Sequence, residues 1–173
     1  MKNLRQIMLL TLMVTSVVFT SCSSDDDSGD EGNSGDEFLT AIIDGSNFAA
    51  SQSPAVIVGA QSVNGVLAVQ GGDNSGNTIS LAINGYSGVG TYVTGNTITN
   101  TNFIQYLELN NMTPVTWANG LASAALGTVT AGSIEITSDD GTTVQGTFSF
   151  EGYNASDMTS KMITSGEFKA NFD

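Results

Sequence analysis

The chain of 173 residues has no histidine and one cysteine, Cys22, and both shortages restrict its chemistry. A single cysteine cannot form an intramolecular disulfide, and the Cys and His spacings typical of zinc sites are absent. Without histidine there is no imidazole base for general acid-base catalysis or for a Ser-His-Asp triad. A Ser-Lys pair would need Lys161 or Lys169, and neither lies in a recognisable motif.

Basic residues are almost as scarce, since Lys and Arg number 4 against 17 Asp and Glu. Lys2 and Arg5 lie in a segment that we expect to be removed, so two lysines against 17 acids leave a formal side-chain charge of −15. Nucleic-acid binding and electrostatic docking to an anionic membrane both need clustered Lys and Arg. The composition therefore argues against nucleic acid as a partner and excludes such docking. The acidity is read most simply as an aid to solubility.

Residues 1–21 have the three parts of an export signal. Lys2 and Arg5 form a positive start, Ile7 to Phe19 form an apolar run, and the small pair Thr20-Ser21 precedes Cys22. The apolar run is shorter than the about 20 residues that a membrane span needs. We therefore expect a removable signal peptide.

This N-terminal arrangement resembles the lipobox of bacterial lipoproteins, in which a large apolar residue and two small residues precede a modified Cys. Phe19 stands where leucine is usual. The resemblance implies that Cys22 receives a diacylglycerol, that cleavage occurs before it, and that the new amine is acylated with a fatty acid such as palmitate. Two or three acyl chains, at about 0.8 kcal/mol per buried CH₂, hold a protein on a membrane. The alternative is an ordinary secretory signal that ends near a cysteine.

Residues 22–37 are expected to form the lipidated Cys and an acidic, disordered tether. Residues 23–37 contain no apolar side chain and seven of the 17 acids, so they cannot bury enough surface to offset the entropy of ordering. The run Ser24-Asp25-Asp26-Asp27 resembles the surface-export signal of Bacteroidetes lipoproteins. That resemblance implies display on the outer face of the outer membrane. A spacer facing the periplasm is the alternative.

Residues 38–173 predict a single all-β domain, an antiparallel β-sandwich or closed meander barrel of about 8–10 strands. The clearest strand is Val144–Glu151, where Val144, Phe148 and Phe150 alternate with polar residues and Gly146 shares their face. The other predicted strands are Leu39–Ile43, Ala55–Ala60, Val66–Gln70, Thr78–Asn84, Gly90–Thr94, Ile104–Leu109, Gly127–Thr137 and Gly166–Phe172. The predicted turns are Asp44-Gly45, Asn64-Gly65, Asn84-Gly85 and Asp140-Gly141. Ala118–Leu126 and Ala155–Met162 could each be a short helix or a loop.

Motifs in this order resemble a Bacteroidetes lipoprotein family that carries a domain of unknown function, the 6252-type family. The motifs are Asp44–Phe48, Gly90–Tyr92, Ile134–Thr137, Val144–Phe150 and Ile163–Phe168. Residues 96–125 show no matching pattern. The resemblance implies the location and an all-β fold, and it brings no catalytic residues and no cofactor.

The acidic residues offer two candidate chemistries. Paired carboxylates at Asp139 and Asp140 could hydrolyse a glycosidic bond, but Asp and Gly between two strands are also what a tight turn requires. Calcium is the metal that oxygen ligands suit, and its candidate ligands are Asp73, Asp139 and Asp140, with Asn74 beside them. The strand carboxylates Glu108, Glu135 and Glu151 are expected to face solvent.

Trp117 and Tyr106 are the candidate ligand-binding residues, because aromatic rings can form a platform for sugars. Tyr86, Tyr92 and Tyr153 could join them. The alternative is that these rings pack in the core.

The expected function is a non-enzymatic binding or adhesion module for a glycan or a protein, in a monomeric surface lipoprotein. A carboxylate-dependent hydrolase and a structural accessory of envelope assembly are the alternatives.

Overall fold

The structure is a computed structural model that describes residues 37–51, 58–127 and 129–173. These residues belong to one compact unit of the chain, Asn33–Asp173. The predicted signal peptide, Cys22 and the tether before residue 37 lie outside the described residues. The first half of the predicted strand Ala55–Ala60, residues 55–57, lies outside them as well.

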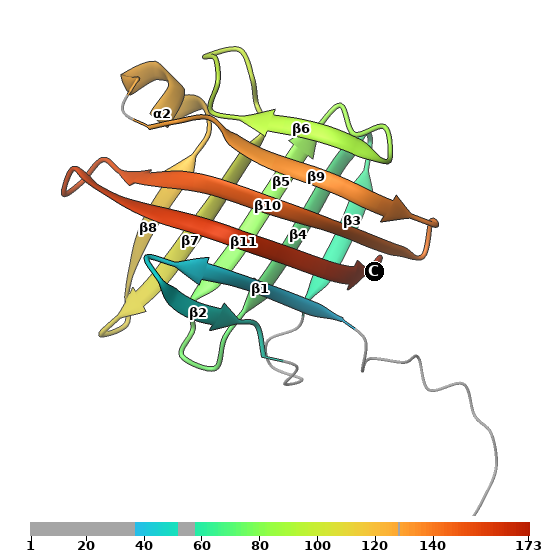
Figure 1. The fold of residues 1–173 in the computed structure, drawn as a ribbon, viewed down its shortest axis with the longest axis horizontal. Helices are drawn as coiled ribbons and strands as arrows, with labels where there is room; N and C mark the ends of the chain where they lie inside the picture. Colours follow the sequence, from blue (N-terminus) through green and yellow to red (C-terminus); the bar gives the residue numbers. More distant parts are fainter. Residues whose placement is uncertain (1–36, 52–57, 128) are drawn as a thin grey trace, which may run out of the picture. The chain divides into compact units, whose positions relative to one another are not determined.

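The described chain forms one sheet of eleven strands in which paired strands are antiparallel, with one short helix beside it (Figure 1). The elements are β1 (Phe38–Ile43), β2 (Ser46–Ala49), β3 (Gly59–Val63), β4 (Val66–Gly72), β5 (Thr78–Asn84), β6 (Gly90–Thr94), β7 (Phe103–Asn110), β8 (Thr113–Asn119), α2 (Leu121–Leu126), β9 (Gly132–Asp139), β10 (Thr143–Asn154) and β11 (Thr159–Asn171).

The sheet branches at β10 and curls into a half-barrel. Its main path is β2-β1-β11-β10-β8-β7-β5-β4-β3, while the first half of β10 also pairs with β9, and β9 pairs with β6. In Figure 1, β3, β4, β5, β7 and β8 form a back layer that crosses a front layer of β1, β2, β6, β9, β10 and β11. A parallel bridge from Ala60 to Phe172 brings the free edge of β3 back to the end of the last strand.

The core lies between the two layers and follows the predicted alternation. On β5, Ile79, Leu81 and Ile83 are fully buried, and on β10 Phe148 and Phe150 are buried opposite them. Each such side chain contributes about 1.5–3 kcal/mol by leaving water. The all-β prediction is thereby confirmed.

Gly146 on β10 is buried on the inner face, as the sequence predicted. A β-carbon there would collide with the carbonyl oxygen of Glu135 on β9 and would lie 2.8 Å from the Phe168 ring on β11. The absence of a side chain lets three strands of the front layer pack closely.

Asn119, at the end of β8, ties the layers together where the sheet branches. It is fully buried, and its Oδ1 accepts hydrogen bonds from Thr94 Oγ1 on β6 at 2.7 Å and from the Gly132 N–H on β9 at 3.2 Å. Its Nδ2 donates to the carbonyl oxygens of Thr130 at 2.7 Å and Glu151 at 2.9 Å. The Asn119 amide therefore satisfies polar groups from several strands at one buried point.

Three of the four predicted turns join neighbouring strands. Asp44-Gly45 and Asn64-Gly65 have positive φ at both residues and close the β1-β2 and β3-β4 hairpins, as type I′ turns do. Asp140-Gly141 connects β9 to β10. Asn84-Gly85 is not a hairpin turn, because the strand that follows, β6, pairs with β9 and not with β5.

Three segments differ from the sequence prediction, and the sheet has eleven strands where about 8–10 were expected. β2 and β8 had no predicted counterpart, since β2 has only four residues and β8 contains Pro114. The segment Ala155–Met162 is a turn followed by the start of β11, not a helix, while α2 forms at the end of the predicted Ala118–Leu126 segment. In each case long-range pairing outweighs weak local preference.

Candidate functional site

The two predicted ligand-binding rings lie inside the fold. Trp117 on β8 and Tyr106 on β7 are paired across the strands and are only 7% and 5% exposed. Their ring centroids are 6.1 Å apart at an interplanar angle of 23°, and the Lys161 Nζ lies 4.5 Å from the Trp117 ring centroid. Trp117 Nε1 donates to Thr159 Oγ1 at 2.9 Å. The rings thus lie in the core, and they present no open platform for a sugar.

A polar hollow of about 310 Å³ opens beside these rings, lined by Asp44, Asp73, Glu108, Lys161 and Tyr106 among others. The Lys161 Nζ is 3.3 Å from Glu108 and 3.9 Å from Asp44, so its charge is matched within the hollow. Burial first, and then the charges of Glu108 and Asp73, raise the pKa of Tyr106 to about 12. Three carboxylates against one ammonium disfavour an anionic ligand here.

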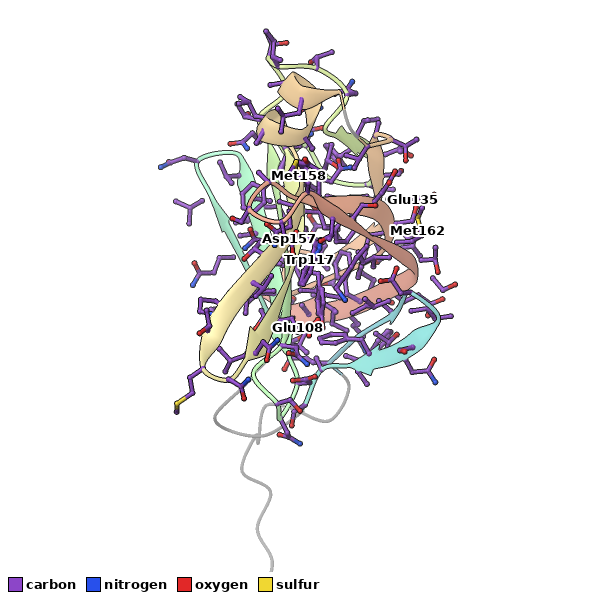
Figure 2. All side chains as sticks on the ribbon, turned by 90° about the vertical axis from the view of Figure 1, so that its left-hand side faces the viewer. Glu108, Trp117, Glu135, Asp157, Met158 and Met162 are labelled. Carbon is purple, nitrogen blue, oxygen red and sulfur yellow. The ribbon has the colours of Figure 1, made fainter. Side chains whose placement is uncertain are left out.

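Glu108 is a correction to the prediction that the strand carboxylates face solvent. It shares the inner side of β7 with Ile104 and Tyr106 and is half-buried. Glu135 is exposed on β9 as predicted, and Figure 2 shows Glu108 and Trp117 between the layers, with Glu135 on the outer side of the front layer. Glu151 faces outward, half-buried, and accepts a hydrogen bond from Thr130 Oγ1 at 3.1 Å.

The carboxylates of Asp139 and Asp140 close the β9-β10 turn. Asp140 Oδ1 accepts hydrogen bonds from the N–H groups of Thr143 and Thr142 at 2.7 and 2.8 Å, and these bonds hold the pKa of Asp140 below its usual range. Asp139 accepts a hydrogen bond of 2.5 Å from the Tyr86 hydroxyl. Burial and the Asp139 carboxylate raise the pKa of Tyr86. Both acids therefore bond within the turn, as the alternative interpretation of Asp-Asp-Gly predicted, and Asp139 also holds Tyr86.

The calcium candidates are not brought together. Asp73 closes the β4-β5 turn through bonds from the Ser75 and Asn77 N–H groups at 2.8 and 2.9 Å. Asp73 lies just before β5. Tyr86, which is hydrogen-bonded to Asp139, lies just after β5. The seven residues of β5, roughly 20 Å in length, therefore separate Asp73 from Asp139. In the described ranges, no three or more His, Cys, Asp or Glu side chains gather to hold a metal ion.

The outward face of the back layer carries no charged side chain, and we name it the neutral face. Its members alternate with the buried residues of β3, β4, β5, β7 and β8. They are Gln61, Val63, Val66, Ala68, Gln70, Thr78, Ser80, Ala82, Asn84, Phe103, Gln105, Leu107, Leu109, Pro114, Thr116 and Ala118.

Strand pairing orders the neutral face into rows that cross the strands. One row, the neutral row, runs Gln61, Ala68, Ala82 and Phe103. The next row runs Gly59, Gln70, Ser80, Gln105, Ala118 and Tyr153. The small side chains of these rows lie between longer ones, so the face is hollowed along them.

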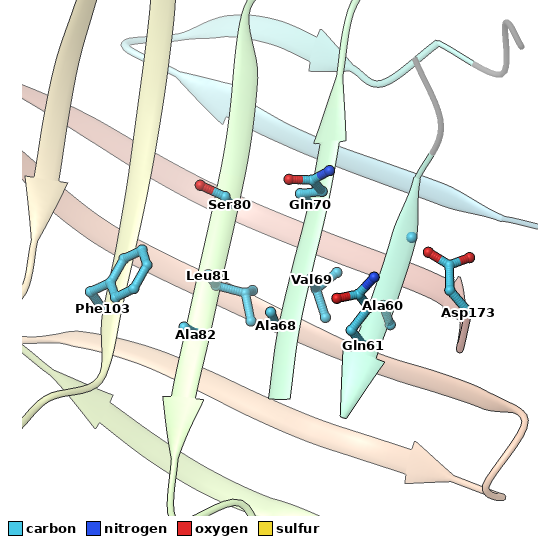
Figure 3. A pocket seen from close by; sticks show the side chains of 11 residues that line it. Ala60, Gln61, Ala68, Val69, Gln70, Ser80, Leu81, Ala82, Phe103 and Asp173 are labelled. Atoms are coloured by element: carbon cyan, nitrogen blue, oxygen red, sulfur yellow. The ribbon is translucent and has the colours of Figure 1, made fainter. Parts of the chain in front are cut away.

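Two adjoining hollows lie on the neutral face. The first, of about 320 Å³, has Phe103 and Gln61 on either side of Ala82 and Ala68, with Gln70 and Ser80 along one flank (Figure 3). The second, of about 330 Å³, shares Phe103 and continues past Gln105 and Ala118 to Tyr153 and α2. Among the residues that the structure describes, Asp173 is the one charged residue that lines either hollow, and it lies at the β3 edge.

Sequence reasoning missed this face, although a signal for it exists. Between Gly45 and Ile134 only Asp73 and Glu108 are charged, whereas the last 39 residues carry nine charged side chains. A stretch with so few charges that alternates at period two indicates a sheet face without ionic groups.

In the part of the chain that the structure describes, no helix has the length and apolarity to cross a membrane.

Comparison with known proteins gives one match. Residues 36–170 match the family model of a domain of unknown function, DUF6252, a range that runs from β1 into the last residues of β11. No curated protein and no solved structure matches the chain. This match confirms the predicted resemblance of residues 38–173 to the domain of unknown function. The chain therefore belongs to the DUF6252 family.

Proposed function

We propose that this chain is an exported lipoprotein of the outer membrane whose β domain is a non-enzymatic binding module, with the neutral face as its binding surface. The observation that carries the proposal is the charge distribution. A chain with 17 acids and 4 bases keeps every charged residue off the outward positions of five adjacent strands. Solubility alone would be served by charges on that face as well.

The two hollows support the choice of surface. Each has about the volume of a small ligand site, and the two adjoin at Phe103. The polar hollow at Lys161 is a weaker candidate, because its one ammonium is already paired with the carboxylates of Glu108 and Asp44.

The lipid anchor rests on the lipobox-like sequence before Cys22, and the surface location rests on the acidic run after it. A tether of about 15 residues reaches at most roughly 50 Å, which would hold the domain clear of the lipid headgroups. Cys22→Ser is expected to abolish incorporation of radiolabelled palmitate and to leave the precursor uncleaved. Incorporation that persists in the variant would refute the anchor.

Display on the cell exterior is tested separately. Protease added to intact cells should digest the domain of the full chain, whereas a periplasm-facing domain would be digested only after the outer membrane is opened.

The binding function is tested by retention of partners. The full chain in detergent is exposed to a glycan array and to cell-surface extracts, alongside Ala68→Glu on the neutral face and Thr147→Glu on the front layer. Both sites are exposed strand positions, so they form a matched pair. We expect Ala68→Glu to lose the retained partner and Thr147→Glu to keep it. Equal retention by both variants would refute the neutral face as the binding surface.

The hydrolase alternative has its own test. Any hydrolytic activity found in the purified chain should fall in Asp139→Asn and Asp140→Asn if those carboxylates catalyse it. A structural accessory of envelope assembly would instead co-purify with an outer-membrane protein.

A further inference from the structure

We propose that the neutral face binds an uncharged polysaccharide, whose chain lies along the two adjoining hollows. This inference rests on the binding function proposed above and adds the chemical class of the ligand.

The hydrogen-bonding groups of the face suit hydroxyls. A sugar hydroxyl both donates and accepts, and a glutamine amide offers two N–H donors and a carbonyl acceptor. Gln61 and Gln70 are exposed at the first hollow, and Gln105 lies beside the second. Gln105 Nε2 donates to Ser80 Oγ at 3.0 Å, which orients both side chains before a ligand binds.

The apolar groups suit the C–H faces of sugar rings. Phe103 is 38% exposed where the hollows meet, and the methyl groups of Ala68 and Ala82 floor the first hollow beside it. A ring resting on Phe103 would remove apolar surface from water, while its hydroxyls would reach the flanking amides.

The charges exclude the other common class of polysaccharide. A uronate or sulfated polymer would find no cation on the face, since Lys161 and Lys169, the lysines of the described chain, both lie on β11 of the front layer. Its approach to an acidic protein would also be repulsive. Asp173 at the groove edge can accept bonds from hydroxyls but repels carboxylates.

The combined length of the two hollows suits a polymer better than a single sugar. The second row crosses six strands, from Gly59 on β3 to Tyr153 on β10. Strands lie about 4.8 Å apart, so this row, whose members line the two hollows, extends over roughly 24 Å, room for several linked sugar residues.

The test compares two phenylalanines that differ in the face they occupy. Phe103 and Phe38 each begin a strand and are each 38% exposed, but Phe38 lies on β1 in the front layer. Binding of the full chain in detergent is measured by calorimetry with soluble xylan, a mannan and a β-glucan, with polygalacturonate as the charged comparison. Circular dichroism melting confirms that each variant is folded.

At least one neutral polymer is expected to bind, with affinity at least about tenfold lower in Phe103→Ala and changed less than about twofold in Phe38→Ala. Polygalacturonate is expected not to bind. Ala68→Glu should weaken binding of the neutral polymer, as Phe103→Ala does, and Thr147→Glu should leave binding unchanged.

Four results would overturn the inference. They are failure of all three neutral polymers to bind, equal binding of polygalacturonate, equal loss in the two phenylalanine variants, or unchanged binding in Phe103→Ala. If the polymers fail but a protein or a second copy of the chain is retained and then lost in Ala68→Glu, the polysaccharide is wrong and the binding function stands. If nothing retained by the wild type depends on Ala68, the binding function fails as well.

Discussion

The two layers of the sheet share one core and differ in what they show to solvent. In the front layer, pairing places Thr40, Glu167, Thr147, Glu135 and Thr91 in one outward row, the acidic row. In the back layer, the neutral row holds two alanines, a glutamine and a phenylalanine. Inward positions are constrained by burial in both layers, so the contrast is confined to residues that the fold does not require.

Because of this difference, effects on stability and effects on ligand binding can be tested with separate substitutions. A substitution on the acidic row should act mainly through charge repulsion between neighbours. A substitution on the neutral row should act mainly on a partner. The junction between the layers belongs to both and should show the largest effect of all.

Replacing Asn119 by leucine should break the junction. The change removes both hydrogen-bonding ends of the amide and takes away a partner from four groups, of which those of Thr94 and Gly132 are buried, at about 1–3 kcal/mol for each buried group left unsatisfied. We expect the free energy of unfolding to fall by about 3–5 kcal/mol, measured as a shift of the urea midpoint at constant slope. Asn110→Leu, at an exposed site, should change it by less than about 0.5 kcal/mol, and equal effects would contradict the role of Asn119.

A glycine pair compares close packing in the two layers. Gly146→Ala would push a β-carbon into the Glu135 carbonyl and the Phe168 ring, so it should cost about 2–3 kcal/mol. Gly59→Ala, at the edge of the back layer, meets only Asp173 at an ordinary 3.5 Å and should cost less than about 1 kcal/mol. Thermal and urea unfolding of both variants measure the difference. A Gly59→Ala effect as large as that of Gly146→Ala would show that the layers are equally tight.

Charge insertion sharpens the comparison of the two outward rows. Thr147→Glu places a third carboxylate directly between Glu135 and Glu167, so it should cost about 0.5–1 kcal/mol at low salt and less at high salt. Ala68→Glu has Gln61 and Ala82 as neighbours and should cost less than about 0.5 kcal/mol. Thr147→Lys is the control of opposite sign and should stabilise the fold slightly. A salt-independent cost for Thr147→Glu would mean that the acidic row is not governed by repulsion.

At neutral pH the titration of Tyr106 does not change the stability of the fold, and its effect is confined to alkaline solution. Its pKa is about 12 in the fold against about 10 in the unfolded chain, so the unfolded state releases its proton first as the pH rises. The stability that the protonated Tyr106 hydroxyl contributes is therefore fully present below about pH 10 and is lost between about pH 10 and 12. Urea midpoints of Tyr106→Phe should fall less over that range than those of the wild type. Parallel profiles would place the alkaline transition elsewhere, with Tyr86, whose pKa is also raised, as the next residue to replace.

Local sequence signals predicted the hairpins and the buried faces where they were strong. Asp44-Gly45 and Asn64-Gly65 favour the positive φ that a type I′ turn needs, and the alternation of Ile79, Leu81 and Ile83 marks one side of a strand as buried. The sequence did not predict β8, because Thr113–Asn119 includes a proline, a residue that disfavours strands. In the structure β8 pairs with β10 only at Ala118. Trp117 and Tyr106 were predicted as candidate ligand-binding rings, with core packing as the alternative, and only the tertiary packing of the two rings shows that they are buried.

The amino-acid sequence alone was enough to predict the all-β class, the alternation of the strands and the family, and it shows the scarcity of charge from residue 45 to 134. These properties depend on residues that are close together in the sequence, so local propensity and the alternation of apolar and polar residues are enough to show them. Only the tertiary structure decided that Asp73 and Asp139 lie far apart, that Glu108 turns inward, and that Gln61, Ala68, Ala82 and Phe103 form one row. Such groupings depend on strand order and register, and a shift of one residue in register would move every one of those side chains to the other face.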